Sequence, residues 1–296
     1  MIDFELSPEI QRNKDMVHMV AEQAMRPISR EYEEREHEKP SDFLEMMWQA
    51  SRNSPVSFGG DGKRTKEKKE PSTRHLISVV TIEELSWGDA GLYLSIPNAG
   101  LGGAAVSAAG TPEQRRRFLA RFKDGEPKWG AMAITEPGCG SDSAAITTTA
   151  RRDGDSWVLN GTKIFVTSGL MAAEKSDGFV VVWATVDKSA GRAGIKAFVV
   201  ERGTPGMQVA KVENKMGIRA SDTAMIVFED CRIPADNILG SPIVQQQQSS
   251  EGFKGVMATF DATRPAVAAS AIGIGRAAVE FVREAQIGRA SCRERV

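Results

Sequence analysis

The stretch Ala131–Asp142 constrains the fold of this chain more than any other part of it. The apolar run Ala131–Ile134 predicts a strand, and Glu136, which precedes a proline, cannot continue it as a helix. Gly138 and Gly140 then let a flat ligand approach the backbone and expose amide N–H groups to it. A Rossmann fingerprint is excluded, because no third glycine follows at the required spacing and no helical pattern opens. The alternative interpretation is a strand that ends in a polar turn.

Length and composition narrow the class of protein. The chain has 296 residues, enough for about two domains of ordinary size. With 41% hydrophobic and 26% charged residues, it has the profile of a soluble globular protein. The net charge of −1 gives no support for nucleic acid or an anionic membrane as a partner. No apolar run approaches the roughly 18 residues of a membrane span, so no span is expected.

Cysteine and histidine usage argues against metal and disulfide chemistry. The three cysteines lie far apart and form no CxxC motif, which predicts a reducing compartment. The three histidines lie outside the stretch above and the Asn160-Gly161 region, so neither a zinc site nor a Ser-His triad is expected. We therefore predict no metal. The cysteines are Cys139, Cys231 and Cys292, and the histidines are His18, His37 and His75.

Helix signals dominate residues 1–128. Ser7 is a predicted N-cap with proline at the next position, and Thr111 begins a helix with a first-turn proline and a capping-box Gln114. A proline at position 27 is expected to kink or end the first helix. The charge run 33–39 is predicted to be a solvated face. Further helices are predicted over 42–50 and 75–87.

From Lys128 onwards the hydrophobic period becomes two, which is typical of strands. Asn160-Gly161 lies between two β-rich runs and predicts a hairpin through a type I′ turn. Short strands separated by such turns favour an antiparallel β domain over βαβ units. The predicted strands cover 131–134, 147–152, 157–159, 163–167, 179–186, 196–200, 208–211 and 224–228.

Three blocks of sequence resemble the acyl-CoA dehydrogenase family. They are Ala133–Asp142 (AITEPGCGSD), Asn160–Gly169 (NGTKIFVTSG) and Met216–Thr223 (MGIRASDT), the last followed by VFED and IP. The resemblance covers the chain from near residue 1 to about Gln286. It implies an α+β fold in the order helical, antiparallel β, helical. The domains expected are an N-terminal α-helical domain over 1–128, a middle β domain over 129–240, and the first helix of a C-terminal helical-bundle domain over 241–286.

The resemblance also implies a function. Members of this family are FAD-dependent enzymes of fatty acid β-oxidation that oxidise the Cα–Cβ bond of an acyl-CoA thioester. A carboxylate removes the α proton and a hydride passes from Cβ to flavin N5. Thr135 and Thr167 would hydrogen-bond the flavin ring, and Phe165 stands where relatives most often have a stacked Trp. The implied FAD residues are Met132, Ile134, Thr135, Gly140, Ser141, Phe165 and Thr167. The implied acyl-CoA residues are Ser141, Asp261 and Arg264.

The position of the catalytic base is less simple. Asp261 and Arg264 would contact the CoA portion, although the same spacing also suits an intrahelical ion pair. One base position known in the family is occupied here by Thr263, which does not ionise near neutral pH. The other falls in the C-terminal domain beyond this helix. Residues 287–296 resemble a translated sequencing adapter and are predicted to be non-native, so a C-terminally truncated and inactive polypeptide is expected.

Other interpretations remain open at this point. A relative that uses oxygen, such as an acyl-CoA oxidase, a nitroalkane oxidase or a flavin monooxygenase, would share the same blocks. A non-catalytic flavin- or acyl-CoA-binding scaffold would explain the absent base. For a dehydrogenase, the resemblance implies an electron-transfer flavoprotein as electron acceptor and a homotetramer or dimer. It places the protein in the bacterial cytoplasm or, in a eukaryote, the mitochondrial matrix.

Overall fold

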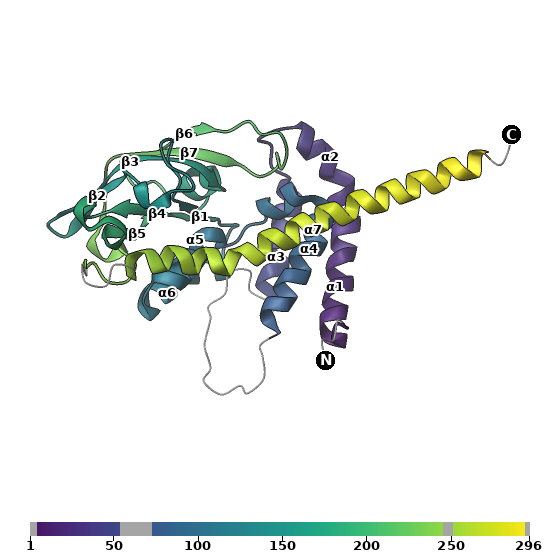
Figure 1. Ribbon diagram of the computed structural model, residues 1–296, viewed down its shortest axis with the longest axis horizontal. Helices are drawn as coiled ribbons and strands as arrows, with labels where there is room; N and C mark the ends of the chain where they lie inside the picture. The colour runs from purple at the N-terminus through teal and green to yellow at the C-terminus, as the bar shows by residue number, and fades with distance from the viewer. Residues whose placement is uncertain (1–4, 54–72, 245–250, 294–296) are drawn as a thin grey trace.

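The structure, a computed structural model, describes residues 5–53, 73–244 and 251–293. Figure 1 shows helices α1–α4 on one side, the β-sheet on the other, and one long helix, α7, running across both. The helices are α1 Pro8–Val20, α2 Arg26–Glu34, α3 Ser41–Asn53, α4 Arg74–Ser95, α5 Gly100–Ala109, α6 Pro112–Leu119 and α7 Glu251–Arg293. The strands are β1 Gly130–Ala133, β2 Thr149–Asp153, β3 Ser156–Thr167, β4 Phe179–Thr185, β5 Ile195–Glu201, β6 Met207–Val212 and β7 Thr223–Pro234.

Local signals place several helix ends as predicted. The Ser7 hydroxyl accepts the amide of Ile10 at 3.4 Å at the start of α1. At α6 the capping box is complete, with Gln114 N donating to Thr111 Oγ1 at 3.2 Å and Thr111 N donating to Gln114 Oε1 at 3.0 Å. Between α1 and α2 the chain passes through a π-helical turn over Ala21–Met25 and remains helical, so the proline at 27 does not end the helix.

Helix α4 is longer than predicted and is interrupted at Asp89. The backbone there is extended, and the Asp89 carboxylate accepts the amide of Leu92 at 2.7 Å, which caps the second half of the helix. The hydroxyl of Ser29, on α2, donates to the other carboxylate oxygen at 2.5 Å. Helix α5 is not indicated by any cap or periodic pattern used above, because it is rich in glycine and alanine.

The middle of the chain forms one seven-stranded sheet in the order β1-β4-β2-β3-β7-β6, with β5 paired to β4. Most pairs are antiparallel, as predicted, but β1 pairs with β4 in parallel, with Gly130 opposite Phe179. Strand β2 also pairs with β4 in parallel, with Thr149 opposite Thr185, so the prediction of an antiparallel domain is wrong for these two pairs. The reason is topological: β2 and β3 lie between β1 and β4 along the chain, and this long connection lets β4 return in the same direction as β1.

The predicted hairpin at Asn160-Gly161 is wrong. Both residues lie inside the single strand β3, where Gly161 pairs with Phe228 of β7 across a register irregularity. The Asn160 side chain donates to Asp230 Oδ1 at 3.1 Å and accepts the Asp230 amide at 2.8 Å. Strand β7 runs beside the whole of β3, so a continuous ladder replaces the local turn that the dipeptide favours.

The charge run at the end of α2 is a solvated face only in part: Glu34, Arg35, His37 and Glu38 are exposed, whereas the other three residues are paired. Glu33 accepts the Arg219 amide at 2.9 Å, and Glu36 accepts the Lys215 amide at 2.6 Å and the Arg219 guanidinium at 2.8 Å. Lys39 donates to Asp222 Oδ1 at 3.0 Å. The run therefore holds the β6–β7 connection against the N-terminal helices.

Helix α7 packs on α4, α5 and β5. Its Gly273 meets α4 closely, since a Cβ there would lie 2.2 Å from the carbonyl oxygen of Glu83. Arg276 of α7 donates to Glu84 Oε1 at 2.8 Å and to Glu83 Oε1 at 2.6 Å. The small residue and the guanidinium together fix the helix on α4. The helical geometry extends over 287–293, which does not test whether that tail is native.

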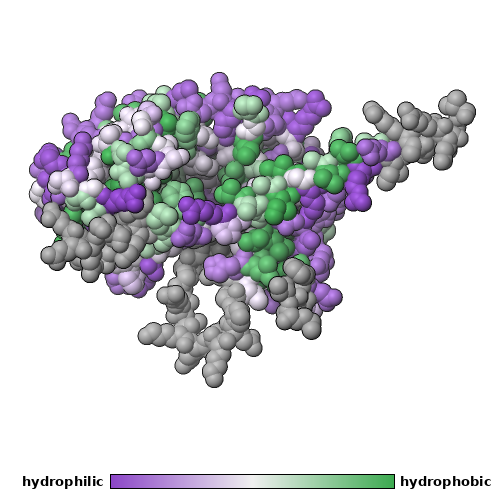
Figure 2. Space-filling model, viewed as in Figure 1, coloured by the Kyte–Doolittle hydropathy of each residue, from purple (hydrophilic) through white to green (hydrophobic). Residues whose placement is uncertain are grey.

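Part of the remaining surface of α7 is apolar. Val267 is 70% exposed and Phe281 is 69% exposed, and Figure 2 shows hydrophobic side chains along the helix. Among the described residues, α7 has one stretch, Gly255–Gln286, whose length and apolar composition would allow it to cross a membrane. Buried helices of water-soluble proteins share those properties, so the absence of a membrane span stays a prediction. The segments 59–69 and 245–248 lie outside the described residues.

Candidate functional site

The loop after β1 forms a closed turn that leaves its glycines open to an incoming ligand. Glu136 N donates to Cys139 O at 2.9 Å, and Cys139 N donates back at 3.1 Å. A Cβ added at Gly138 would meet nothing within 4 Å, and one at Gly140 would meet only the Thr135 methyl group at 3.9 Å. Contacts within the chain do not require glycine at either position. The free space suits a flat ligand lying against the backbone.

The Glu136 carboxylate lies beneath this loop and is fully satisfied. It accepts the amide and hydroxyl of Thr147 at 2.7 and 2.6 Å, and those of Thr148 at 2.9 and 2.6 Å. Lys163 of β3 donates to it at 2.8 Å. Burial by itself would raise the pKa of Glu136, but the hydrogen bonds from Lys163, Thr147 and Thr148 outweigh it and lower the pKa to about 2. The group is therefore a buried anion at neutral pH.

Strand β3 approaches the loop through a bulge. Its register with β7 shifts between Lys163 and Val166, and the freed amide of Ile164 donates to Thr135 O at 2.9 Å. Phe165 takes the left-handed backbone conformation, with φ 58°, and its side chain is 61% exposed. A bulky residue held in this conformation and turned to solvent is costly, which favours a functional role for the exposed ring.

The structure brings together some of the predicted cofactor residues. Thr135 and Phe165 lie on the two segments that the Ile164–Thr135 hydrogen bond joins, and Thr167 follows on the same strand, opposite Thr223. Ser141 and Gly140 are exposed in the loop. Met132 and Ile134 are 7% and 8% exposed and pack in the core beneath. Their side chains therefore support the loop from below.

The predicted substrate residues lie on α7. Arg264 donates to Asp261 at 3.0 Å, and both side chains are more than half exposed, so the intrahelical ion pair exists. Whether these residues also bind CoA stays a prediction. The Thr263 hydroxyl donates to the carbonyl of Thr259 at 3.1 Å, which uses its proton within the helix.

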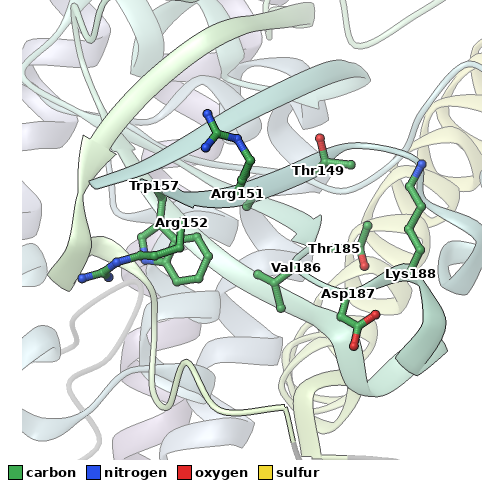
Figure 3. A pocket seen from close by; sticks show the side chains of 9 residues that line it. Thr149, Arg151, Arg152, Trp157, Thr185, Val186, Asp187 and Lys188 are labelled. Carbon is green, nitrogen blue, oxygen red and sulfur yellow. The ribbon is translucent and has the colours of Figure 1, made fainter. Parts of the chain in front are cut away.

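A separate cavity of about 540 Å³ lies beside β2 and the turn after β4. Figure 3 shows Arg151 and Lys188 at its two sides with Thr149 between them. None of the residues that line it is a predicted cofactor or substrate residue. Across residues 5–53, 73–244 and 251–293 there is also no group of three or more His, Cys, Asp and Glu that could hold a metal ion. The loop after β1 thus remains the candidate site.

Sequence reasoning missed Glu136 and Lys163 as a pair. Lys163 is fully buried, and it also donates to the carbonyl of Ile134 at 3.0 Å. One signal could have found it: in the run KIFVT, a lysine stands inside a strand of otherwise apolar and β-branched residues. A buried lysine needs a carboxylate, and Glu136 is one of the two acidic residues of the facing block, with Asp142.

Comparison with known proteins agrees with this geometry. Residues 7–126 match the family model "Acyl-CoA dehydrogenase, N-terminal domain", and residues 131–231 match "Acyl-CoA dehydrogenase, middle domain". A helical N-terminal region, a middle sheet with a glycine-containing loop, and a long helix across both define this class of protein. The chain belongs to the acyl-CoA dehydrogenase family.

Individual relatives make the comparison more specific. The chain is 36% identical over 286 residues to the short-chain specific acyl-CoA dehydrogenase of Clostridium acetobutylicum, covering 95% of this chain and 69% of that protein. It is 38% identical over 265 residues to the mitochondrial short-chain specific acyl-CoA dehydrogenase of Bos taurus, covering 88% of this chain but 58% of the relative. The structure of butyryl-CoA dehydrogenase from Megasphaera elsdenii superposes with a TM-score of 0.78 at 32% identity, over 96% of this chain and 70% of that one.

Proposed function

We propose that this chain binds FAD and an acyl-CoA thioester and takes part in α,β-dehydrogenation of that thioester. The observation that carries the proposal is the open, doubly hydrogen-bonded loop of Gly138 and Gly140, which the Ile164–Thr135 hydrogen bond joins to the segment that carries the exposed Phe165. Family membership makes FAD the flat ligand that fits this space. The short-chain specificity of the relatives favours a short acyl group, since both curated relatives described above act on such substrates by name.

Each loop residue has a distinct part in binding. FAD, when bound, supplies the acceptor for the hydride that leaves the substrate Cβ. Phe165 offers an apolar face to a ring system, without the N–H that an indole would add. Thr135 contributes a hydroxyl beside the Ile164–Thr135 contact, Thr167 one three residues further along β3, and Ser141 one in the exposed part of the loop. The substrate's CoA portion would lie along α7 at Asp261 and Arg264.

The residue at position 263 implies that the 296-residue polypeptide does not turn over substrate by itself. Removal of the α proton needs a carboxylate with a suitable pKa near the substrate. Thr263 occupies one base position of the family and its hydroxyl is bonded to its own helix. We therefore propose that this polypeptide binds but does not dehydrogenate. Electron-transfer flavoprotein as acceptor, a homo-oligomeric state, and a cytoplasmic or mitochondrial matrix location follow from the family and are part of the proposal.

The test has two stages. Titration of the purified chain with FAD, followed by quenching of flavin fluorescence, should show saturable binding. Anaerobic addition of butyryl-CoA should then leave the visible flavin absorbance unchanged in the parent chain and bleach it slowly in Thr263→Glu. Thr263→Gln, with the same size and no charge, should behave as the parent does.

Two results would contradict the proposal. Absence of saturable FAD binding would remove the flavin site. Bleaching of the parent chain at enzyme-like rates would show a base other than the one at position 263. Rapid reoxidation of the bleached flavin by air would instead favour an oxidase of the same superfamily.

A further inference from the structure

Three chain segments meet at the Glu136 carboxylate. The first is the loop after β1 that carries Glu136 itself, and the second is the entry to β2, which donates through the amides and hydroxyls of Thr147 and Thr148. The third is the β3 bulge, which donates through Lys163. Lys163 also donates to Ile134 O at 3.0 Å, so it ties the end of β1 to β3 at two points. One buried pair thus holds all three segments that border the proposed flavin site.

Stability alone does not account for this pair. The Lys163 and Glu136 side chains are 0% and 3% exposed, the deepest ion pair among the described residues. A buried ion pair is often replaced by apolar residues of similar size with no loss of stability, because desolvation offsets the attraction. What an apolar pair cannot reproduce is the direction of five hydrogen bonds on one carboxylate.

Those directions set the position of Phe165. Lys163 and Val166 flank the bulge and are both fully buried, so the two residues between them have no freedom to slide along β7. The Ile164 amide meets Thr135 O at 2.9 Å, and the next residue is Phe165 with its left-handed backbone. Such a conformation is strained and persists only where its surroundings determine it. The Lys163–Glu136 pair is the buried ion pair at the edge of this bulge.

We propose that Glu136 and Lys163 are positioning residues that hold the Thr135–Ser141 loop and the Phe165 bulge at the separation a flavin ring requires. This inference rests on the proposed function. It adds to that function the two residues that preorganise the flavin site. Both side chains are buried, so neither is exposed to a ligand that binds over the loop. Loss of the pair should therefore lower the amide protection of the loop and the bulge without unfolding the sheet.

The experiment compares four variants of the full chain. Glu136→Gln and Lys163→Met each remove one charge, and the double variant removes both. Arg121→Gln is the matched control, because it breaks a partly buried pair with Glu201 at 3.1 Å, away from the loop. Hydrogen exchange followed by mass spectrometry, on the ligand-free chain, reports the amides of 134–148 and 163–166. FAD affinity and the thermal midpoint are measured on the same samples.

Both single variants should lose amide protection in these two segments and bind FAD at least tenfold more weakly. The double variant should regain most of its thermal midpoint, because no uncompensated charge stays buried, yet keep the weakened FAD affinity. Arg121→Gln should lower the midpoint without changing protection or affinity. Where a single variant fails to fold, Lys163→Arg, which keeps the charge but replaces the compact ammonium with a bulkier planar group, should show the local loss of protection.

Two outcomes overturn the inference. Unchanged protection of the loop and bulge in the variants would show that the pair does not position them, whether or not FAD binds. Recovery of FAD affinity in the double variant, in step with its thermal midpoint, would show that the pair serves stability alone. If the parent chain binds no FAD at all, the proposed function fails, and hydrogen exchange on the ligand-free chain still decides the positioning role.

Discussion

Replacing Arg276 by methionine is expected to loosen α7 from the N-terminal helices. The Arg276 guanidinium contacts Glu84, whose side chain is 1% exposed, as well as Glu83 and Glu280. Glu84 would keep only His18 at 2.8 Å and Lys14 at 3.7 Å. Methionine preserves the length and apolar stem of the side chain, so the change removes chiefly the charge and its hydrogen bonds.

The expected loss in the free energy of unfolding follows from the burial of Glu84. Removing one partner of a buried pair costs about 3–5 kcal/mol. Arg276 is 25% exposed and Glu84 retains two other partners, which puts the expected loss at the lower end, about 3 kcal/mol. Burial would raise the pKa of Glu84, but hydrogen bonds from Arg276 and His18 outweigh it and lower the pKa. The loss should therefore be full above the ordinary pKa of a glutamate and shrink as the pH falls below it.

Urea unfolding at pH 7, followed by tryptophan fluorescence, measures the effect, since Trp87 donates to Glu280 of α7 at 2.6 Å. Arg264→Met is the matched control on the same helix. Its pair with Asp261 is 63% and 68% exposed, so it should cost no more than about 0.5 kcal/mol. If the two variants unfold at the same urea concentration, Arg276 does not anchor α7 and the reasoning is refuted.

Further predictions concern the loop and β3. The pKa of Glu136 is lowered from 4.5 to about 2, which at ~1.4 kcal/mol per unit is roughly 3 kcal/mol of stability. Because the folded pKa is the lower one, this stability is present above pH 4.5 and lost towards pH 2, and urea midpoints of Glu136→Gln should lack that part of the pH dependence. Gly161→Ala should lower stability by about 2 kcal/mol in urea titrations, since its Cβ would lie 2.4 Å from Thr148 Oγ1 at a φ of +151°. Gly138→Ala, whose Cβ meets nothing within 4 Å, should leave the urea midpoint within about 0.5 kcal/mol but weaken FAD binding, and equal affinity would argue against a ligand at that loop.

Signals that act over three or four residues were sufficient to predict part of the fold. The caps at Ser7 and Thr111 depend only on side chains and amides within one turn, and both form as predicted. The alternation of strands from Lys128 onwards likewise places most of the sheet. The AITEPGCGSD block pointed to the candidate site, because its glycines and proline restrict the local backbone in any context.

The sequence was not enough to predict the structure where pairing between distant segments overrides a local preference. Asn160-Gly161 favours a tight turn, yet β7 offers a ladder along the whole of β3 and Asp230 pairs with the Asn160 side chain. The same holds for the charge run after α2, whose carboxylates find the backbone amides of Lys215 and Arg219. Local propensities amount to a few tenths of a kcal/mol per residue, about one for glycine, and a long ladder or a buried pair exceeds them.

The sequence by itself determined the family, the order of helical and β regions, and the loop that faces the proposed flavin. Only the tertiary structure decided that β1 and β4 run in parallel and that Glu136 lies beneath that loop with Lys163. The physical reason is that a buried charge has to find its partner across the fold. Twenty-seven positions separate these two residues, and the local pattern around Lys163 calls for a carboxylate without showing where along the chain it lies.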